Sequence, residues 1–119
     1  MPMLTLRNEF TPATFNTQPL TGQIAEAFAG RFGPQRVVKT KAQMGGEDFS
    51  RYYLADKSIQ SLLFWVGGVP QAKWDAVKGD VTRLPSIHSP FWAPDPEITI
   101  TTATEAMTTA ALTVLGKRK

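Results

Sequence analysis

The chain has 119 residues, a hydrophobic fraction of 42% and a net charge of +3. This length fits one domain or part of a larger one, and the apolar content argues against disorder along the whole chain. The sequence has no cysteine, which excludes disulfides, a thiol nucleophile and cysteine-ligated zinc. No apolar run could span a bilayer, and the first seven residues lack the layout of a signal peptide, so we expect a cytoplasmic protein without a membrane partner.

The positive charge lies mainly at one end of the chain. Lys117, Arg118 and Lys119 supply three positive charges, and the other Lys and Arg residues are scattered. A basic triplet after a helix complements the negative end of the helix dipole, whereas a surface that follows phosphates needs basic residues clustered on one face. We therefore expect no nucleic-acid partner, although the pI of about 9.5 leaves a small nucleic-acid-binding domain as an alternative.

Three segments are predicted to be strands. Leu4, Leu6 and Phe10 alternate with polar residues and indicate a half-buried strand over residues 4–10. Residues 36–42 form a second short candidate. The run at 61–66, Ser-Leu-Leu-Phe-Trp-Val, is the clearest candidate, and its continuous apolar pattern is typical of a sheet covered on both faces.

Three helices are predicted between these strands and after them. The first runs from about Leu20 to Gly33-Pro34, with Asn16 or Thr17 as a possible cap. The second is short and spans Phe49 to about Leu54. The third follows a long loop over residues 67–96 and ends at Gly116. The buried face of the first helix is expected to contain Leu20, Ile24, Ala27, Phe28 and Phe32. The buried face of the last helix is expected to contain Ala103, Met107, Ala110, Ala111 and Val114. Thr102 and Glu105 are expected to form a capping box at the start of the last helix.

This order predicts an α/β fold with about three strands and three helices. A glycine turn at residues 43–50 joins the second strand to the second helix and contains Gly45-Gly46 followed by Glu47-Asp48. Two interpretations are open. The backbone N–H groups of the turn could bind an anion or a substrate carboxylate, or the turn could simply begin a helix whose acidic residues complement its dipole. Neighbouring residues at a helix start point apart, so Glu47 and Asp48 do not form a facing carboxylate pair.

His88 is the only histidine and lies in the long loop. A single loop histidine is commonly a surface or packing residue, but neutral imidazole is also a good metal ligand and a general acid or base. A catalytic zinc site needs about three protein ligands, so one histidine with scattered carboxylates does not make a complete site. Nucleophile-elbow, P-loop and dinucleotide motifs are absent.

The motifs occur in an order that resembles the C-terminal end of amidohydrolases of metallopeptidase family 20, the branch of hippurate hydrolase and of the N-acyl-amino-acid and auxin-conjugate hydrolases. The resemblance covers nearly the whole chain. It includes Phe-Thr-Pro-Ala-Thr-Phe-Asn at 10–16, Met-Gly-Gly-Glu-Asp-Phe at 44–49, the strand at 61–66, His-Ser-Pro at 88–90 and the last helix with Glu-Ala-Met at 105–107. Trp92 and Ala103 depart from the family pattern, which more often has phenylalanine and glycine there.

The resemblance implies a larger enzyme with a zinc-peptidase-like α/β/α catalytic domain and an inserted lid domain. Residues 1–10 would be the end of a lid strand or its remnant, and residues 11–119 would be the closing third of the catalytic domain, a partial α/β/α sandwich. By the same resemblance His88 would bind one of two catalytic metal ions. Asn16, Gly45, Gly46 and Glu47 would line the substrate site.

The implied reaction is cleavage of the amide bond of an N-acyl amino acid. In the complete enzyme, divalent metal ions (zinc, or manganese or cobalt) activate water, and a glutamate carries its proton to the leaving amine. The other metal ligands and that glutamate are not in this sequence. We therefore expect that the chain is inactive alone, binds no metal tightly and needs the missing N-terminal catalytic portion as its partner. The alternative is a non-catalytic binding or oligomerisation module, because a partial domain exposes apolar surface and is prone to form homo-oligomers.

Overall fold

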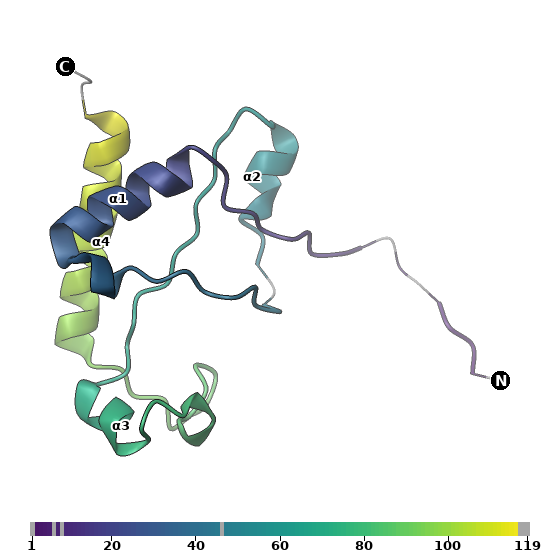
Figure 1. The fold of residues 1–119 in the computed structure, drawn as a ribbon. Coiled ribbons are helices and arrows are strands. Elements are labelled where there is room, and N and C mark those ends of the chain that lie inside the picture. Colours follow the sequence, from purple (N-terminus) through teal and green to yellow (C-terminus); the bar gives the residue numbers. More distant parts are fainter. Residues whose placement is uncertain (1, 6, 8, 46, 117–119) are drawn as a thin grey trace. The chain divides into compact units, whose positions relative to one another are not determined.

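The computed structural model describes residues 2–5, 7, 9–45 and 47–116. The chain divides into two compact units, Met1–Phe64 and Trp65–Lys119. Unit 1 contains the helices α1 (Leu20–Phe32) and α2 (Ser50–Ala55), with a 3-10 turn at Pro34–Arg36. Unit 2 contains α3 (Gln71–Ala76), a 3-10 turn at Val81–Arg83 and the long helix α4 (Pro96–Leu115) (Figure 1).

The predicted α/β fold is wrong for the described residues, which contain helices and connecting segments but no β-strand. The predicted partial sandwich of about three strands is therefore not formed. Leu4 is 84% exposed and Phe10 is 71% exposed, so the first candidate segment buries neither of these apolar side chains. Leu6, in the same segment, lies outside the described residues. A period-two pattern becomes a strand only when a partner strand takes up its backbone hydrogen bonds.

The segment 61–66 is anchored by side chains instead of by a strand. The Asn16 side chain makes two hydrogen bonds to the backbone of Leu63: its Nδ2 donates to the carbonyl at 2.9 Å, and its Oδ1 accepts from the N–H at 2.8 Å. Next to it, Thr17 N–H donates to the Ser61 carbonyl at 2.8 Å, and Thr17 Oγ1 accepts from Ser61 N–H at 2.8 Å. We call this set of four bonds the Asn16–Thr17 clasp. It satisfies one edge of the segment and leaves a strand partner unnecessary there.

Helix α1 confirms the predicted helix and its end. Gly33, with φ of 94°, ends it, and the Gly33 N–H donates to Ala29. The start differs from the prediction, because Asn16 and Thr17 are engaged in the clasp and their side chains do not cap the helix. Gln60 Oε1 accepts from Leu20 N–H instead, at 2.9 Å, which satisfies one of the open donors of the first turn.

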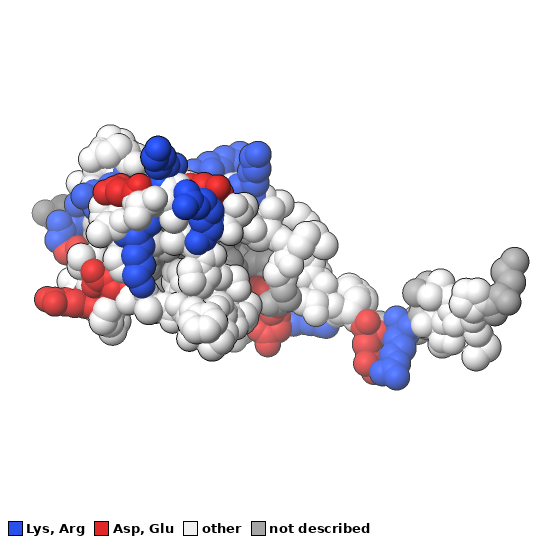
Figure 2. Space-filling model, turned by 90° about the horizontal axis from the view of Figure 1, so that it is seen from below, with Lys and Arg blue, Asp and Glu red and all other residues white. Residues whose placement is uncertain are grey.

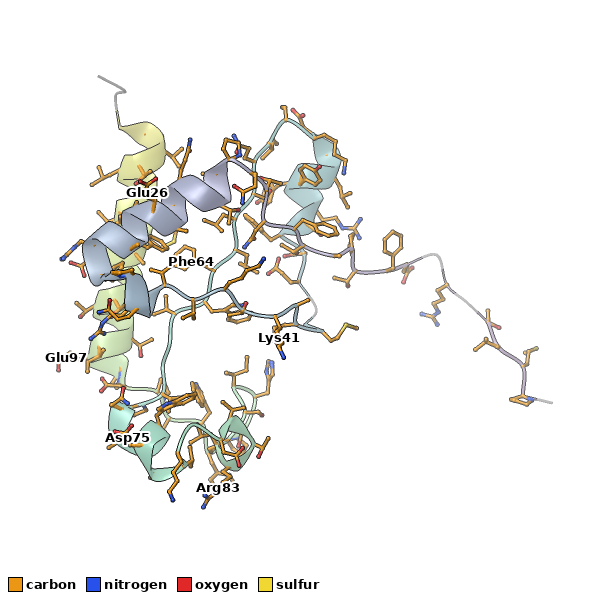
Figure 3. The ribbon with its side chains drawn as sticks, in the orientation of Figure 1. Glu26, Lys41, Phe64, Asp75, Arg83 and Glu97 are labelled. Carbon is orange, nitrogen blue, oxygen red and sulfur yellow. The ribbon has the colours of Figure 1, made fainter. Side chains whose placement is uncertain are left out.

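The core of unit 1 lies on the predicted face of α1. Ile24 and Phe28 are buried there, with 1% and 9% of their surfaces exposed. The Phe28 ring packs edge to face on Phe64 at 5.0 Å between centroids and on Phe32 at 5.9 Å. Figure 3 shows the Phe64 side chain beside α1. This aromatic cluster ties the segment held by the clasp to the helix.

In unit 2 the predicted long loop contains a helix that the sequence analysis missed, α3, and the last helix begins earlier than predicted. Helix α4 starts at Pro96, and the Asp95 side chain caps it by accepting from Ile98 N–H at 3.1 Å. Thr102 and Glu105 are therefore interior residues and not a capping box. The helix ends before Gly116 as predicted. Of the side chains expected to be buried, Met107 and Val114 are each 60% exposed.

We expect Phe28→Ala to lower the free energy of unfolding by about 3 kcal/mol, because it removes both ring contacts and leaves a cavity. Phe15→Ala is the matched control, since Phe15 is 64% exposed in the same unit and its loss should cost under about 0.5 kcal/mol. Urea unfolding followed by circular dichroism measures both. Equal losses would contradict the packing described for α1.

Candidate functional site

The site residues predicted from the sequence fall in different units. Asn16, Gly45 and Glu47 belong to unit 1, and His88 belongs to unit 2. Gly46 lies outside the described residues. The glycine turn and His88 are therefore each described within their own unit.

Glu47 has a local structural role at the start of α2. Its carboxylate accepts a hydrogen bond from the Phe49 N–H, which would otherwise lack a partner before the first helical turn. Gly45 is exposed, with no atom within 4 Å of the position that a Cβ would take. The helix start is also tied to the N-terminal segment, because Arg51 Nη2 donates to the Phe10 carbonyl at 3.0 Å. These contacts fit the interpretation of the turn as a helix start.

Asn16 is likewise engaged by protein groups. Both polar ends of its side-chain amide bond to the Leu63 backbone, so in this conformation the amide orders the segment at 61–64. Its predicted role in substrate binding stays a prediction, and its observed contacts are structural.

His88 sits at the tip of two consecutive turns. The Ser89 N–H donates to the Ser86 carbonyl at 2.9 Å, and the Trp92 N–H donates to the Ser89 carbonyl at 3.0 Å. The Ser89 hydroxyl also accepts from the Phe91 N–H at 3.2 Å. These bonds fix the backbone on both sides of His88. The imidazole is exposed and makes no hydrogen bond within the described part of the chain.

An apolar pocket lies in the same unit, beside the turn that carries His88. Its volume is about 420 Å³. We call it the tryptophan pocket, and its lining residues are Val69, Trp74, Val81, Thr82, Leu84, Pro85, Ser86, Ile87 and Trp92. Ser86 and Ile87 directly precede His88, so the pocket and the imidazole belong to one continuous loop. The pocket was not predicted from the sequence, although Trp74 and Trp92, in a segment rich in glycine and proline, were a usable signal.

The described residues include no group of three or more His, Asp or Glu side chains that could hold a metal ion. His88 alone is one ligand where a zinc site needs about three. Among the described residues, a metal ion bound by His88 would therefore need ligands that are not gathered around it here.

The charged side chains do not form a patch of one sign on the face shown in Figure 2, where Lys and Arg lie among Asp and Glu. The basic triplet at residues 117–119 lies outside the described residues. No helix among residues 2–5, 7, 9–45 and 47–116 is long and apolar enough to cross a membrane.

No protein-family model, curated protein or solved structure matches the chain. The resemblance to family 20 amidohydrolases therefore depends on the motifs alone and remains a prediction, as does the division of the chain at residues 10 and 11.

We expect Asn16→Ala to lower the free energy of unfolding by about 1–2 kcal/mol, because it removes two hydrogen bonds that order the Leu63 backbone. Gln43→Ala is the control, since among the described residues its side chain makes one long hydrogen bond, 3.5 Å, to the nearby Lys41 carbonyl. Denaturant unfolding compares the two variants. An Asn16→Ala chain as stable as the parent would show that the clasp is not needed for the fold.

Proposed function

We propose that the chain is the C-terminal part of a metal-dependent amidohydrolase that cleaves the amide bond of N-acyl amino acids. In this proposal His88 supplies one metal ligand, and the chain is inactive without the N-terminal catalytic portion. The observation that carries the proposal is the His88 turn. It presents an exposed imidazole that no described residue hydrogen-bonds, on a backbone fixed by hydrogen bonds on either side. Together with the order of the family motifs, this arrangement suits a ligand that completes a site formed elsewhere.

The surface area of the chain supports the need for a partner. The accessible surface is 10441 Å². Two folded domains of the sizes of units 1 and 2 would expose about 7,700 Å² together. Among the described residues only Ile24, Phe28 and Ala106 are buried hydrophobic side chains. This balance is typical of a segment that completes its core against another part of a protein.

Helix α4 carries one such unpartnered face. Ile100, Met107 and Val114 recur at intervals of seven residues, which places them on one side of the helix, and each is at least 60% exposed. Ala111 lies on the same side and is also exposed. In the proposed enzyme this stripe packs against the N-terminal catalytic portion.

The same exposed apolar surface supports a second candidate function, a non-catalytic module that associates with copies of itself or with another protein. The two functions differ in what the stripe on α4 contacts. They also differ in whether His88 has any chemical role, so the role of His88 discriminates between them.

The direct test is the DNA immediately upstream of Met1. An in-frame continuation that encodes additional His, Asp and Glu residues spaced as metal ligands would support the amidohydrolase. A stop codon that isolates this chain, with no separate gene for such a portion, would favour the non-catalytic module.

In a longer chain that includes the N-terminal catalytic portion, we expect His88→Ala to lower the hydrolysis of N-acyl amino acids by more than about 100-fold and to reduce the bound zinc, manganese or cobalt. Loss of a metal ligand should lower activity more than loss of a group that only orients a ligand, which costs about 10–100-fold. Ser58→Ala is the control, since Ser58 lies in an exposed turn where its N–H donates to Asp56. Amide hydrolysis and metal content are measured on both variants. The 119-residue chain alone should show no hydrolysis, and turnover by it would contradict the proposal.

A further inference from the structure

We propose that α4 of the 119-residue chain pairs in an antiparallel arrangement with α4 of a second copy of the chain. The surface that pairs is a row of five exposed residues, which we call the α4 seam: Ile100, Thr104, Met107, Ala111 and Val114. The inference deepens the second candidate function, on which it rests, and is independent of the amidohydrolase. It concerns the chain without the N-terminal catalytic portion, which in the proposed amidohydrolase covers the same side of the helix.

The residues of the α4 seam follow one another at alternating spacings of four and three positions. This is the heptad spacing of a coiled coil, in which the residues that face the partner helix occupy positions a and d. Thr104 and Ala111 take the a positions, and Ile100, Met107 and Val114 take the d positions. At a rise of about 1.5 Å per residue the row is about 21 Å long. A row of this length offers a partner helix two full heptads of contact.

The rest of α4 is suited to a pair of identical helices. Its buried side is elsewhere on the helix, where Ala106 is 4% exposed and Thr102 and Thr109 are half-buried. Five uncharged residues flank the seam at the e and g positions: Thr101, Ala103, Thr108, Ala110 and Leu115. In a pair of identical helices, like charges at these positions would repel each other. The flanks of the seam therefore carry nothing that opposes self-association.

Large and small side chains alternate along the α4 seam, and this alternation favours the antiparallel direction. In a parallel pair each a position faces an a position, so small side chains would face each other across a gap and large ones would crowd. In an antiparallel pair each a position faces a d position, so every layer joins a small side chain to a large one. The matching register places Ile100 against Ala111 of the second copy and Met107 against Thr104 of the second copy.

Thr104 is the only polar residue of the α4 seam, and its hydroxyl can be satisfied within its own helix. A threonine hydroxyl in a helix can donate to the carbonyl one turn earlier. The Thr108, Thr109 and Thr113 hydroxyls of α4 make this bond at 2.7–2.8 Å. The same bond from Thr104 to the Ile100 carbonyl would leave the threonine methyl group to face the partner, so covering Thr104 leaves no hydroxyl without a partner.

The two ends of α4 differ in charge. Asp95 and Glu97 lie at its start, and in the sequence Lys117, Arg118 and Lys119 follow its end. An antiparallel pair brings the acidic start of each helix to the basic end of the other, whereas a parallel pair brings like charges together. Complementary charge fixes register and direction, and like charges oppose the wrong arrangement. Charge and side-chain size therefore favour the same direction.

The first test is sedimentation equilibrium of the purified chain, whose monomer has a mass of 13.1 kDa. We expect a reversible equilibrium between monomer and dimer. Met107→Asp should weaken it at least about tenfold, because the change places a charge at the centre of the seam. Leu112→Asp is the matched control, since Leu112 is 67% exposed on the same helix but lies off the seam, and Met107 is 60% exposed. Circular dichroism checks that both variants keep the helix content of the parent.

The second test determines the direction of the pair. The chain has no cysteine, so single introduced cysteines report which positions meet. Chains with Glu97→Cys and chains with Val114→Cys are mixed in equal amounts in a glutathione redox buffer. The proposed register places residue 97 opposite residue 114 of the second copy. We therefore expect the mixed disulfide to exceed its statistical proportion, at the expense of both disulfides between identical chains.

Three results would overturn the proposal. The first is a chain that stays monomeric at all concentrations, and the second is an association that Leu112→Asp weakens as much as Met107→Asp does. The third is a preference for disulfides between identical chains, which a parallel pair would give. The functions remain separable from the pairing. A monomeric chain that binds another protein would leave the non-catalytic module in place, and the amidohydrolase is decided by hydrolysis and metal content, which neither test measures.

Discussion

Unit 1 depends on the Asn16–Thr17 clasp. Through the clasp a polar pair just before α1 holds the backbone at Ser61 and Leu63, residues more than 40 positions away along the chain. This contact brings Phe64 over α1, where its ring meets Phe28. Without the clasp, the apolar contacts of the aromatic cluster alone would have to offset the entropic cost of closing the long loop between these residues. The two described polar residues buried in the chain, Ser50 and Ser61, both lie in this unit, and the clasp satisfies the backbone of the second.

The clasp explains why an apolar run need not form a strand. The six residues at 61–66 have the composition of a covered strand, yet exposure alternates from residue 62 to residue 66: Leu63 and Trp65 are exposed, and the residues between and beside them are half-buried. Side-chain amide and hydroxyl groups supply the hydrogen bonds on one edge. On the other edge of the 61–66 segment, the described backbone at 38–44 forms no strand hydrogen bonds with it. The segment therefore leaves Leu63 and Trp65 exposed.

Local signals predicted the helices well, because helix ends are determined by nearby residues. Gly33 and Gly116 ended helices as predicted, and Ile24 and Phe28 formed the buried face. Strands could not be predicted in this way, since a strand requires a partner with a matching edge, which no local pattern encodes. Helix α3 was not predicted, because it lies between Pro70 and Gly79 in a segment whose glycine and proline content indicates a loop. For the candidate site, the roles predicted for Asn16 and Glu47 stay predictions, and the sequence did not show that backbone groups engage both side chains. The tryptophan pocket could not be predicted locally, because it brings together Trp74 and Trp92, which lie 18 positions apart in the sequence.

The glycine turn and the loop of unit 2 differ in what their side chains contact. The turn at Gly45 and Glu47 has local contacts that account for its sequence, since the Glu47 carboxylate is occupied by the Phe49 N–H. The His88 loop has residues that internal packing does not explain: an exposed imidazole on a backbone fixed by hydrogen bonds, beside an apolar hollow with two positioned tryptophans. A rigid backbone that carries an unpaired imidazole, next to an open apolar pocket, contributes little to stability. In the proposed amidohydrolase this imidazole is a metal ligand, whereas in the non-catalytic module it has no chemical role.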